Sequence, residues 1–121
     1  IESTPGEVGK WFATAKTLRQ FDLALSLAQR SLVDPKTLVR AARDQVASRP
    51  GFALEIALLA LYWMAQGHGR DLSAADVLDA RQHARAAAER LGNEEQVDGR
   101  IAQAVQGTSV SATSIRHILG L

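Results

Sequence analysis

No cysteine occurs in the 121 residues of this sequence, so disulfide bonds, thiolate metal ligands and cysteine nucleophiles are all excluded. Proline and aromatic residues are also few, with three and six positions, and valine and isoleucine together fill only 13. Alanine and leucine dominate instead, with 21 and 15 positions. Because alanine and leucine favour helices whereas β-branched residues favour strands, the composition predicts an all-α fold.

An excess of charge of either sign is lacking as well. The formal net charge is +1; residues 1–50 carry eight basic and five acidic side chains, and residues 51–121 carry six and eight. This mild asymmetry gives no electrostatic reason to expect a nucleic acid or a membrane as the partner. The sequence also shows no signal peptide and no transmembrane segment, so we expect a cytoplasmic protein.

The longest apolar stretch covers residues 52–66 and reads FALEIALLALYWMAQ. Thirteen of its fifteen residues are apolar, and only Glu55 and Gln66 are polar. As a helix it would be roughly 22 Å long. A bilayer span requires about 20 consecutive apolar residues, so this stretch is too short to cross a membrane. A helix that is apolar on every side belongs in the interior of a protein. The stretch therefore predicts the central helix of the fold.

Local signals divide the rest of the chain. Residues 1–9 are expected to be a lead-in or linker, and residues 10–121 a single all-α domain of six or seven short helices, forming part of a larger protein. The pattern leaves open whether residues 10–31 form one helix or two. The expected helix starts are the N-cap residues Asp34, Ser73 (in a capping box with Asp76), Asn93 (with Gln96) and either Ser111 or Thr113. The expected ends are Ser48 ahead of Pro50, Gly67 or Gly69, Gly92 and Gly107.

A weak internal sequence repeat bears on how these helices are arranged. The pattern Phe21-x-Leu23-x-Leu25 recurs 31 residues later as Phe52-x-Leu54-x-Ile56. Offsets of about 30–35 residues are typical of helix-pair repeats. The aromatic and proline positions of the tetratricopeptide repeat are not matched, so a repeat-like stack and an irregular bundle both remain open.

Four segments together carry a resemblance: DPKTLVRAARD, FALEIALLALYWMAQGHG, LSAADV and the terminal RHILGL. They are similar to the C-terminal helical segment of an uncharacterised bacterial family, catalogued only as a domain of unknown function. The resemblance covers roughly residues 20–121. It implies a helical-repeat tail of a larger cytoplasmic protein and brings with it no activity and no site residues.

Two groups of ionisable residues are candidates for sites of chemistry. Asp76, Asp79 and His83 share one helix face at i, i+3 and i+7, but metal sites with histidine usually draw ligands from several helices. A solvated face with a local Asp79–His83 pair is the favoured interpretation. We therefore expect no metal, no other cofactor and no catalytic residue. Glu55, the one acid of the central stretch, is expected in the first turn of its helix, where the helix dipole favours negative charge.

The glycine pair around His68 is interpreted as a helix end, in preference to a mobile loop that presents His68 and Arg70 to an anion. Basic residues suggest a second interpretation. Lys36, Arg40 and Arg43 lie on one side of the predicted third helix, where a stripe of this kind can follow phosphates. The last twenty residues also admit a helix-turn-helix register around Gly107, but that register would bury Thr113 and Arg116. Nucleic acid is therefore the less favoured partner.

The first predicted helical segment is rich in aromatic and large apolar residues, namely Trp11, Phe12, Leu18 and Phe21. In a stacked-helix protein an apolar face left open at one end marks a contact surface. We hypothesise that this segment docks on an upstream domain or a protein partner, and that the isolated chain self-associates through it.

The leading interpretation is a helical-repeat or bundle module that supports protein–protein contacts and is not an enzyme. The first alternative is a nucleic-acid-binding module that uses Arg40, Arg43 and Arg116. The second is an enzyme without a recognisable motif, because no GxSxG, HExxH or P-loop pattern occurs.

Overall fold

The computed structural model describes residues 34–68 and 72–121. Within these ranges the chain forms five helices and no strand, which confirms the predicted all-α class. The helices are α3 (Pro35–Gln45), α4 (Pro50–Ala65), α5 (Ala74–Leu91), α6 (Glu94–Ala104) and α7 (Val110–Leu119). The predicted helix or helices of residues 10–31 lie outside the described residues.

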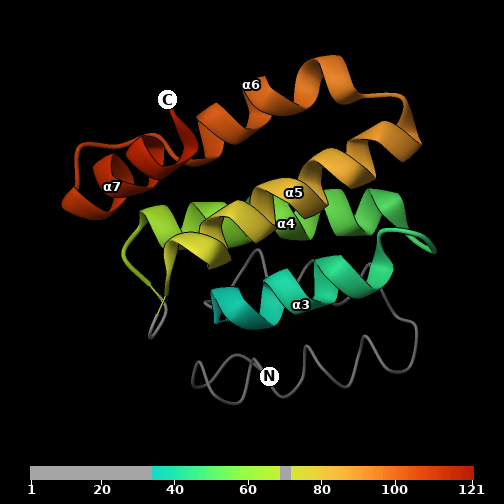
Figure 1. Ribbon diagram of the computed structural model, residues 1–121, viewed down its shortest axis with the longest axis horizontal. Helices are drawn as coiled ribbons and strands as arrows, with labels where there is room; N and C mark the ends of the chain where they lie inside the picture. Colours follow the sequence, from blue (N-terminus) through green and yellow to red (C-terminus); the bar gives the residue numbers. More distant parts are fainter. Residues whose placement is uncertain (1–33, 69–71) are drawn as a thin grey trace, which may run out of the picture.

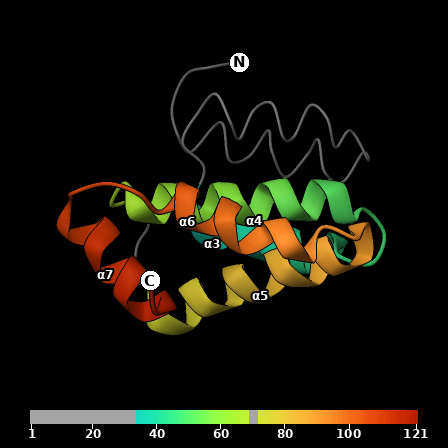
Figure 2. The same ribbon diagram turned by 90° about the horizontal axis from the view of Figure 1, so that it is seen from above.

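Helix α4 is the element on which the other described helices are packed. Successive helices from α3 to α6 run in alternating directions, with α4 in contact with both α3 and α5, as Figure 1 shows. In the perpendicular view of Figure 2, α7 closes one end of the array. Helix α4 contacts each of the other four described helices, and ten of its 16 residues are buried. The apolar stretch at residues 52–66 is thus the central helix of the described part.

Three of the predicted helix boundaries are confirmed in atomic detail. The Asp34 carboxylate accepts a hydrogen bond from the Lys36 backbone N–H at 3.0 Å. At the start of α5, the Ser73 hydroxyl accepts from the Asp76 N–H at 3.3 Å, and the Asp76 carboxylate accepts from the Ser73 N–H at 2.8 Å, which completes a capping box. Gly92 ends α5 in the left-handed conformation with φ 74°.

Other boundaries differ from the prediction. Helix α4 begins at Pro50, two residues early, because the first helical position needs no N–H. Helix α3 ends at Gln45 and is followed by turns, whereas the predicted end lay near Ser48. Asn93 stands at the N-cap of α6, but its side chain makes no capping hydrogen bond.

The start of α7 is a further correction. Neither Ser111 nor Thr113 caps it. The N-cap is Ser109, whose hydroxyl accepts from the Ala112 N–H at 3.1 Å and donates to the Ala65 carbonyl at 3.2 Å. The second bond ties α7 to the last turn of α4, a long-range contact that sequence spacing does not encode.

Small residues let α5 approach α4 closely. Ala80, Ala84 and Ala87 are fully buried on one face of α5, and Val77 lies with them. Leu91, which continues the same spacing, is 40% exposed at the end of the helix. Within the described ranges, no helix combines the length and hydrophobicity that a membrane span requires.

The burial of α4 gives a stability prediction. Leu61→Ala should lower the free energy of unfolding by about 2–5 kcal/mol, because Leu61 is 0% exposed and its loss leaves a cavity. Leu78→Ala is the matched control: this side chain on α5 is 38% exposed, so the same change should cost about 1 kcal/mol or less. Urea denaturation followed by circular dichroism measures both. Equal losses for the two variants would contradict the assigned core.

Candidate functional site

Most of the candidate residues that the structure describes line one of two hollows on its surface. Trp11, Phe12, Leu18 and Phe21, the predicted interaction residues, lie outside the described residues, so their hypothesis stays a prediction. The first hollow is a charged groove between α3 and α5, and the second is a cavity of mixed apolar and hydroxyl lining between α4, α5 and α7.

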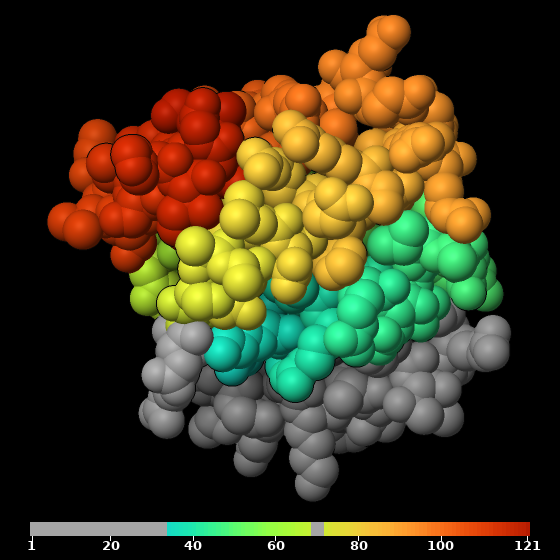
Figure 3. Space-filling model, in the orientation of Figure 1, coloured from blue at the N-terminus to red at the C-terminus, as the bar shows by residue number. Residues whose placement is uncertain are grey.

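The α3–α5 groove has a volume of about 250 Å³. Helices α3 and α5 lie side by side on the face of the molecule shown in Figure 3. The groove is lined by Lys36, Val39, Arg40 and Arg43 of α3 and by Asp76, Asp79 and His83 of α5. The basic residues of α3 and the acidic residues of α5 are far apart in the sequence, but they line opposite sides of one groove.

The two helices run in the same direction, so their stripes match along the groove. At one end the Lys36 ammonium lies 4.0 Å from the Asp76 carboxylate. At the other end Arg43 is close enough to His83 to act on its charge. Because both stripes repeat about once per helical turn, Arg40 lies at the level of Asp79 between these ends.

Only part of this charge is paired. Asp76 is engaged by Lys36 and by the capping box, and Arg43 donates from Nε to its neighbour Asp44 at 3.1 Å. Arg40 and Asp79 are both exposed, and neither enters an ion pair within the part of the chain that the structure describes. The middle of the groove therefore presents a guanidinium on one wall and a carboxylate on the other.

His83 sits half-buried at the end of the groove. Burial lowers its pKa below the ordinary value of 6.5, and Arg43 acts in the same direction, whereas Asp79 and Asp44 raise it. Burial is the largest of these effects, so the neutral imidazole is favoured near neutral pH. A neutral ring can donate one hydrogen bond and accept another.

The same residues were the metal-ligand candidates of the sequence. Among the residues that the structure describes, no group of three or more histidines and acids is placed to hold a metal ion. Asp76, Asp79 and His83 are distributed along the groove wall, and Asp76 already has its own partners. What this arrangement offers is recognition of separated charges.

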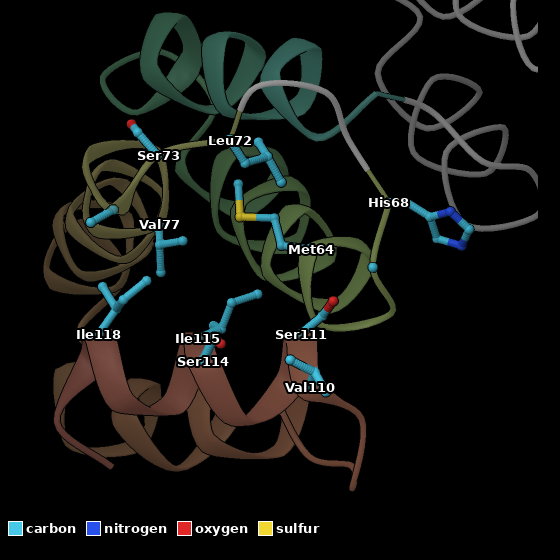
Figure 4. A pocket seen from close by; sticks show the side chains of 12 residues that line it. Met64, His68, Leu72, Ser73, Val77, Val110, Ser111, Ser114, Ile115 and Ile118 are labelled. Atoms are coloured by element: carbon cyan, nitrogen blue, oxygen red, sulfur yellow. The ribbon is translucent and has the colours of Figure 1, made fainter.

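The second hollow, the α4–α7 cavity, has a volume of about 380 Å³, and none of the described residues that line it is Asp, Glu, Lys or Arg. In Figure 4, Met64, Leu72 and Val77 face Ile115 and Ile118 across it. The lining is completed by Gly67, His68, Ser73, Ala74, Val110, Ser111 and Ser114.

The rim of this cavity is fixed by the end of α4. Gly67 has φ 88°, as predicted for one of the two glycines, and a Cβ added there would lie 3.3 Å from the Ser111 hydroxyl oxygen. The next residue, His68, donates its backbone N–H to the Trp63 carbonyl at 3.1 Å, and its ring meets the Trp63 ring edge-on at 5.4 Å. Its side chain points away from the cavity (Figure 4). These contacts agree with the helix-end interpretation; Arg70 lies outside the described residues.

Glu55 belongs to neither hollow. Its two carboxylate oxygens accept from the two terminal nitrogens of Arg100 at 2.8 Å each, which joins α4 to α6. These hydrogen bonds raise the pKa of the Arg100 guanidinium. Because α4 begins at Pro50, Glu55 is in the second turn and not in the first as predicted. Glu55 therefore stabilises the packing of α4 on α6. Its partner Arg100 is 45 residues away, so the local sequence pattern could not identify this ion pair.

The last two helices do not follow the helix-turn-helix register. Thr113, which that register would bury, is exposed. The Arg116 guanidinium donates to the Val105 carbonyl at 2.9 Å, so it is occupied with the end of α6. Of the basic residues in the nucleic-acid interpretation, Arg116 is therefore engaged within the fold and Arg40 faces an acidic wall.

No protein-family model, no curated protein and no solved structure matches this chain. Its function therefore has to be inferred from its own residues.

The environment of His83 predicts an NMR result. The ring should titrate with a midpoint below 6.5 in the folded protein and move to about 6.5 in urea. A folded pKa below the unfolded one stabilises the protein above pH 6.5, and this contribution is lost as pH falls through the folded pKa. His83→Gln should therefore flatten the fall in unfolding free energy between about pH 7 and pH 5. A folded midpoint at or above 6.5 would show that burial does not dominate.

Proposed function

We propose that this chain is a helical-repeat or bundle module that supports protein–protein contacts, and that it acts by binding and not by catalysis. The observation that carries the proposal is the α4–α7 cavity. Side chains from three helices line it, and the lining combines apolar side chains with the hydroxyl groups of three serines and has no Asp, Glu, Lys or Arg side chain among the described residues. Grooves of this kind accept the apolar face of an amphipathic helix from a partner.

Exposure at the rim supports this role. Val110 is 84% exposed at the first position of α7, beside a cavity that already contains Ile115 and Ile118. Exposed apolar side chains beside a cavity are a common feature of interaction sites. The seryl hydroxyls of Ser111 and Ser114 add hydrogen-bonding groups without a charge that a partner would have to desolvate.

The arrangement of the helices is the second support. Helix α3 runs in the same direction as α5, and α4 and α6 run in the opposite one (Figure 1). We infer two helix pairs, α3–α4 and α5–α6, stacked as in a repeat protein. In such stacks each pair buries its apolar face on the next, which is how they support extended contact surfaces. The resemblance to the C-terminal segment of an uncharacterised bacterial family implies a helical-repeat tail, and we include that expectation in this proposal.

A second contact surface is proposed from sequence alone. Trp11, Phe12, Leu18 and Phe21 concentrate half of the chain's aromatic residues in one short segment. Tryptophan and other aromatic side chains are enriched where interfaces bind most tightly. We propose that this segment contacts a protein partner or another domain of the same polypeptide.

The two alternatives have less support. A nucleic-acid-binding surface needs basic side chains directed at phosphates. Here the Arg116 guanidinium donates a hydrogen bond to the Val105 carbonyl. Lys36, Arg40 and Arg43 line a groove whose other side carries acidic side chains of α5. An enzyme needs a nucleophile or acid–base pair converging on a cavity. In the described part, the larger cavity has no charged lining residue and the His68 ring points away from it.

The proposal predicts what a peptide library selected on the immobilised protein should yield. We expect enriched peptides with apolar residues at i, i+4 and i+7, because these positions form one face of a helix. Val110→Asp should weaken their binding by on the order of tenfold, since a charge at the rim must be desolvated. Fluorescence anisotropy of a labelled peptide measures the loss.

Leu91→Asp is the matched control, because Leu91 is 40% exposed and does not line the cavity. It should leave peptide affinity unchanged. A double variant, Trp11→Ser with Phe12→Ser, shows whether the aromatic segment contributes to the same binding event. Failure to enrich any peptide, or equal weakening by Val110→Asp and Leu91→Asp, would contradict a binding role for the cavity.

A further inference from the structure

The α3–α5 groove has opposite charges on its two walls, and this property is independent of the α4–α7 cavity. Arg40 extends from one wall and Asp79 from the other, and neither has an ion-pair partner in the described residues. We propose that the groove binds a small zwitterion, with its carboxylate against Arg40 and its ammonium group against Asp79.

The ends of the groove restrict the ligand to its middle. At one end the Lys36–Asp76 contact and the capping box occupy the charges of both residues. At the other end His83 adds a hydrogen-bonding ring, and burial keeps its pKa below 6.5, so it adds little positive charge at neutral pH. Arg40 and Asp79, which form no ion pair within the described residues, are thus left in the middle of the groove, where one ligand can contact both helices.

The dimensions suit a short bifunctional molecule. Packed helices have axes about 8–10 Å apart, so charged groups on facing stripes are separated by several ångströms. A volume of about 250 Å³ holds a chain of several carbons with a charged group at each end. Val39, only 8% exposed, lies among the charged residues and offers an apolar contact for such a chain.

Ions of a single sign fit the groove less well. An inorganic anion near Arg40 would also lie near Asp79, and a cation near Asp79 would lie near Arg40. Opposite charges on one ligand convert both repulsions into attractions. The favoured class is therefore a zwitterion whose ammonium and carboxylate are joined by a short aliphatic chain, such as an ω-amino acid.

Isothermal titration calorimetry of the full chain with 6-aminohexanoate tests this. Hexanoate and hexylammonium, which each carry one of the two charges, are the matched ligands. We expect 6-aminohexanoate to bind on the order of tenfold more tightly than either, because a hydrogen-bonded charge contact is worth about tenfold or more in affinity. Arg40→Gln and Asp79→Asn should each reduce its affinity to the level of the single-charge ligands.

Arg90→Gln is the control variant, since Arg90 is an exposed residue of α5 that does not line the groove. It should bind 6-aminohexanoate as the parent chain does, and circular dichroism of all variants reports whether the fold is kept. Equal binding of the three ligands, or no binding of any, would overturn the proposal. So would a double-mutant cycle without ligand that shows Arg40 and Asp79 already coupled, because the walls would then be closed by their own ion pair.

Discussion

Burial of the apolar helix α4 against four other helices of the described part is the constraint on which the rest of this structure depends. A helix without a polar face can be covered only if other helices surround it, and α3, α5, α6 and α7 all contact it. Glu55 is its one charged side chain, and it lies where Arg100 of α6 can bind both carboxylate oxygens. The small residues of α5, such as Ala80 and Ala84, allow the close approach that this burial requires.

Both hollows follow from this arrangement. Because α3 and α5 pack on the same helix and run in the same direction, their outer edges meet and form the charged groove. Helix α7 is held against the end of α4 by the Ser109 hydroxyl, and the space left between them and α5 is the α4–α7 cavity. The two hollows have different chemistry, because charged side chains of both signs line the groove and only uncharged apolar and polar groups of the described residues line the cavity.

Local signals were enough to predict much of the fold but little of the site. Asp34, Ser73 with Asp76, and Gly92 act through bonds within a few residues, so sequence alone located them. Ser109 was missed because the link before α7 is rich in Ser and Thr, so local signals do not distinguish its cap from Ser111 or Thr113; its hydroxyl also binds Ala65, 44 residues away. The α3–α5 groove was missed for the same reason: each stripe was visible by its spacing, but only tertiary packing places Arg40 opposite Asp79.

Native-state hydrogen exchange tests the central position of α4 most directly. If the surrounding helices depend on it, the amides of its middle turns, those of Leu58 and Leu61 included, should exchange only by global unfolding. Their exchange free energy would then equal the unfolding free energy measured with urea, while amides of α7 would exchange through smaller openings. Amides of α4 that exchange at a lower free energy than those of α7 would contradict this account.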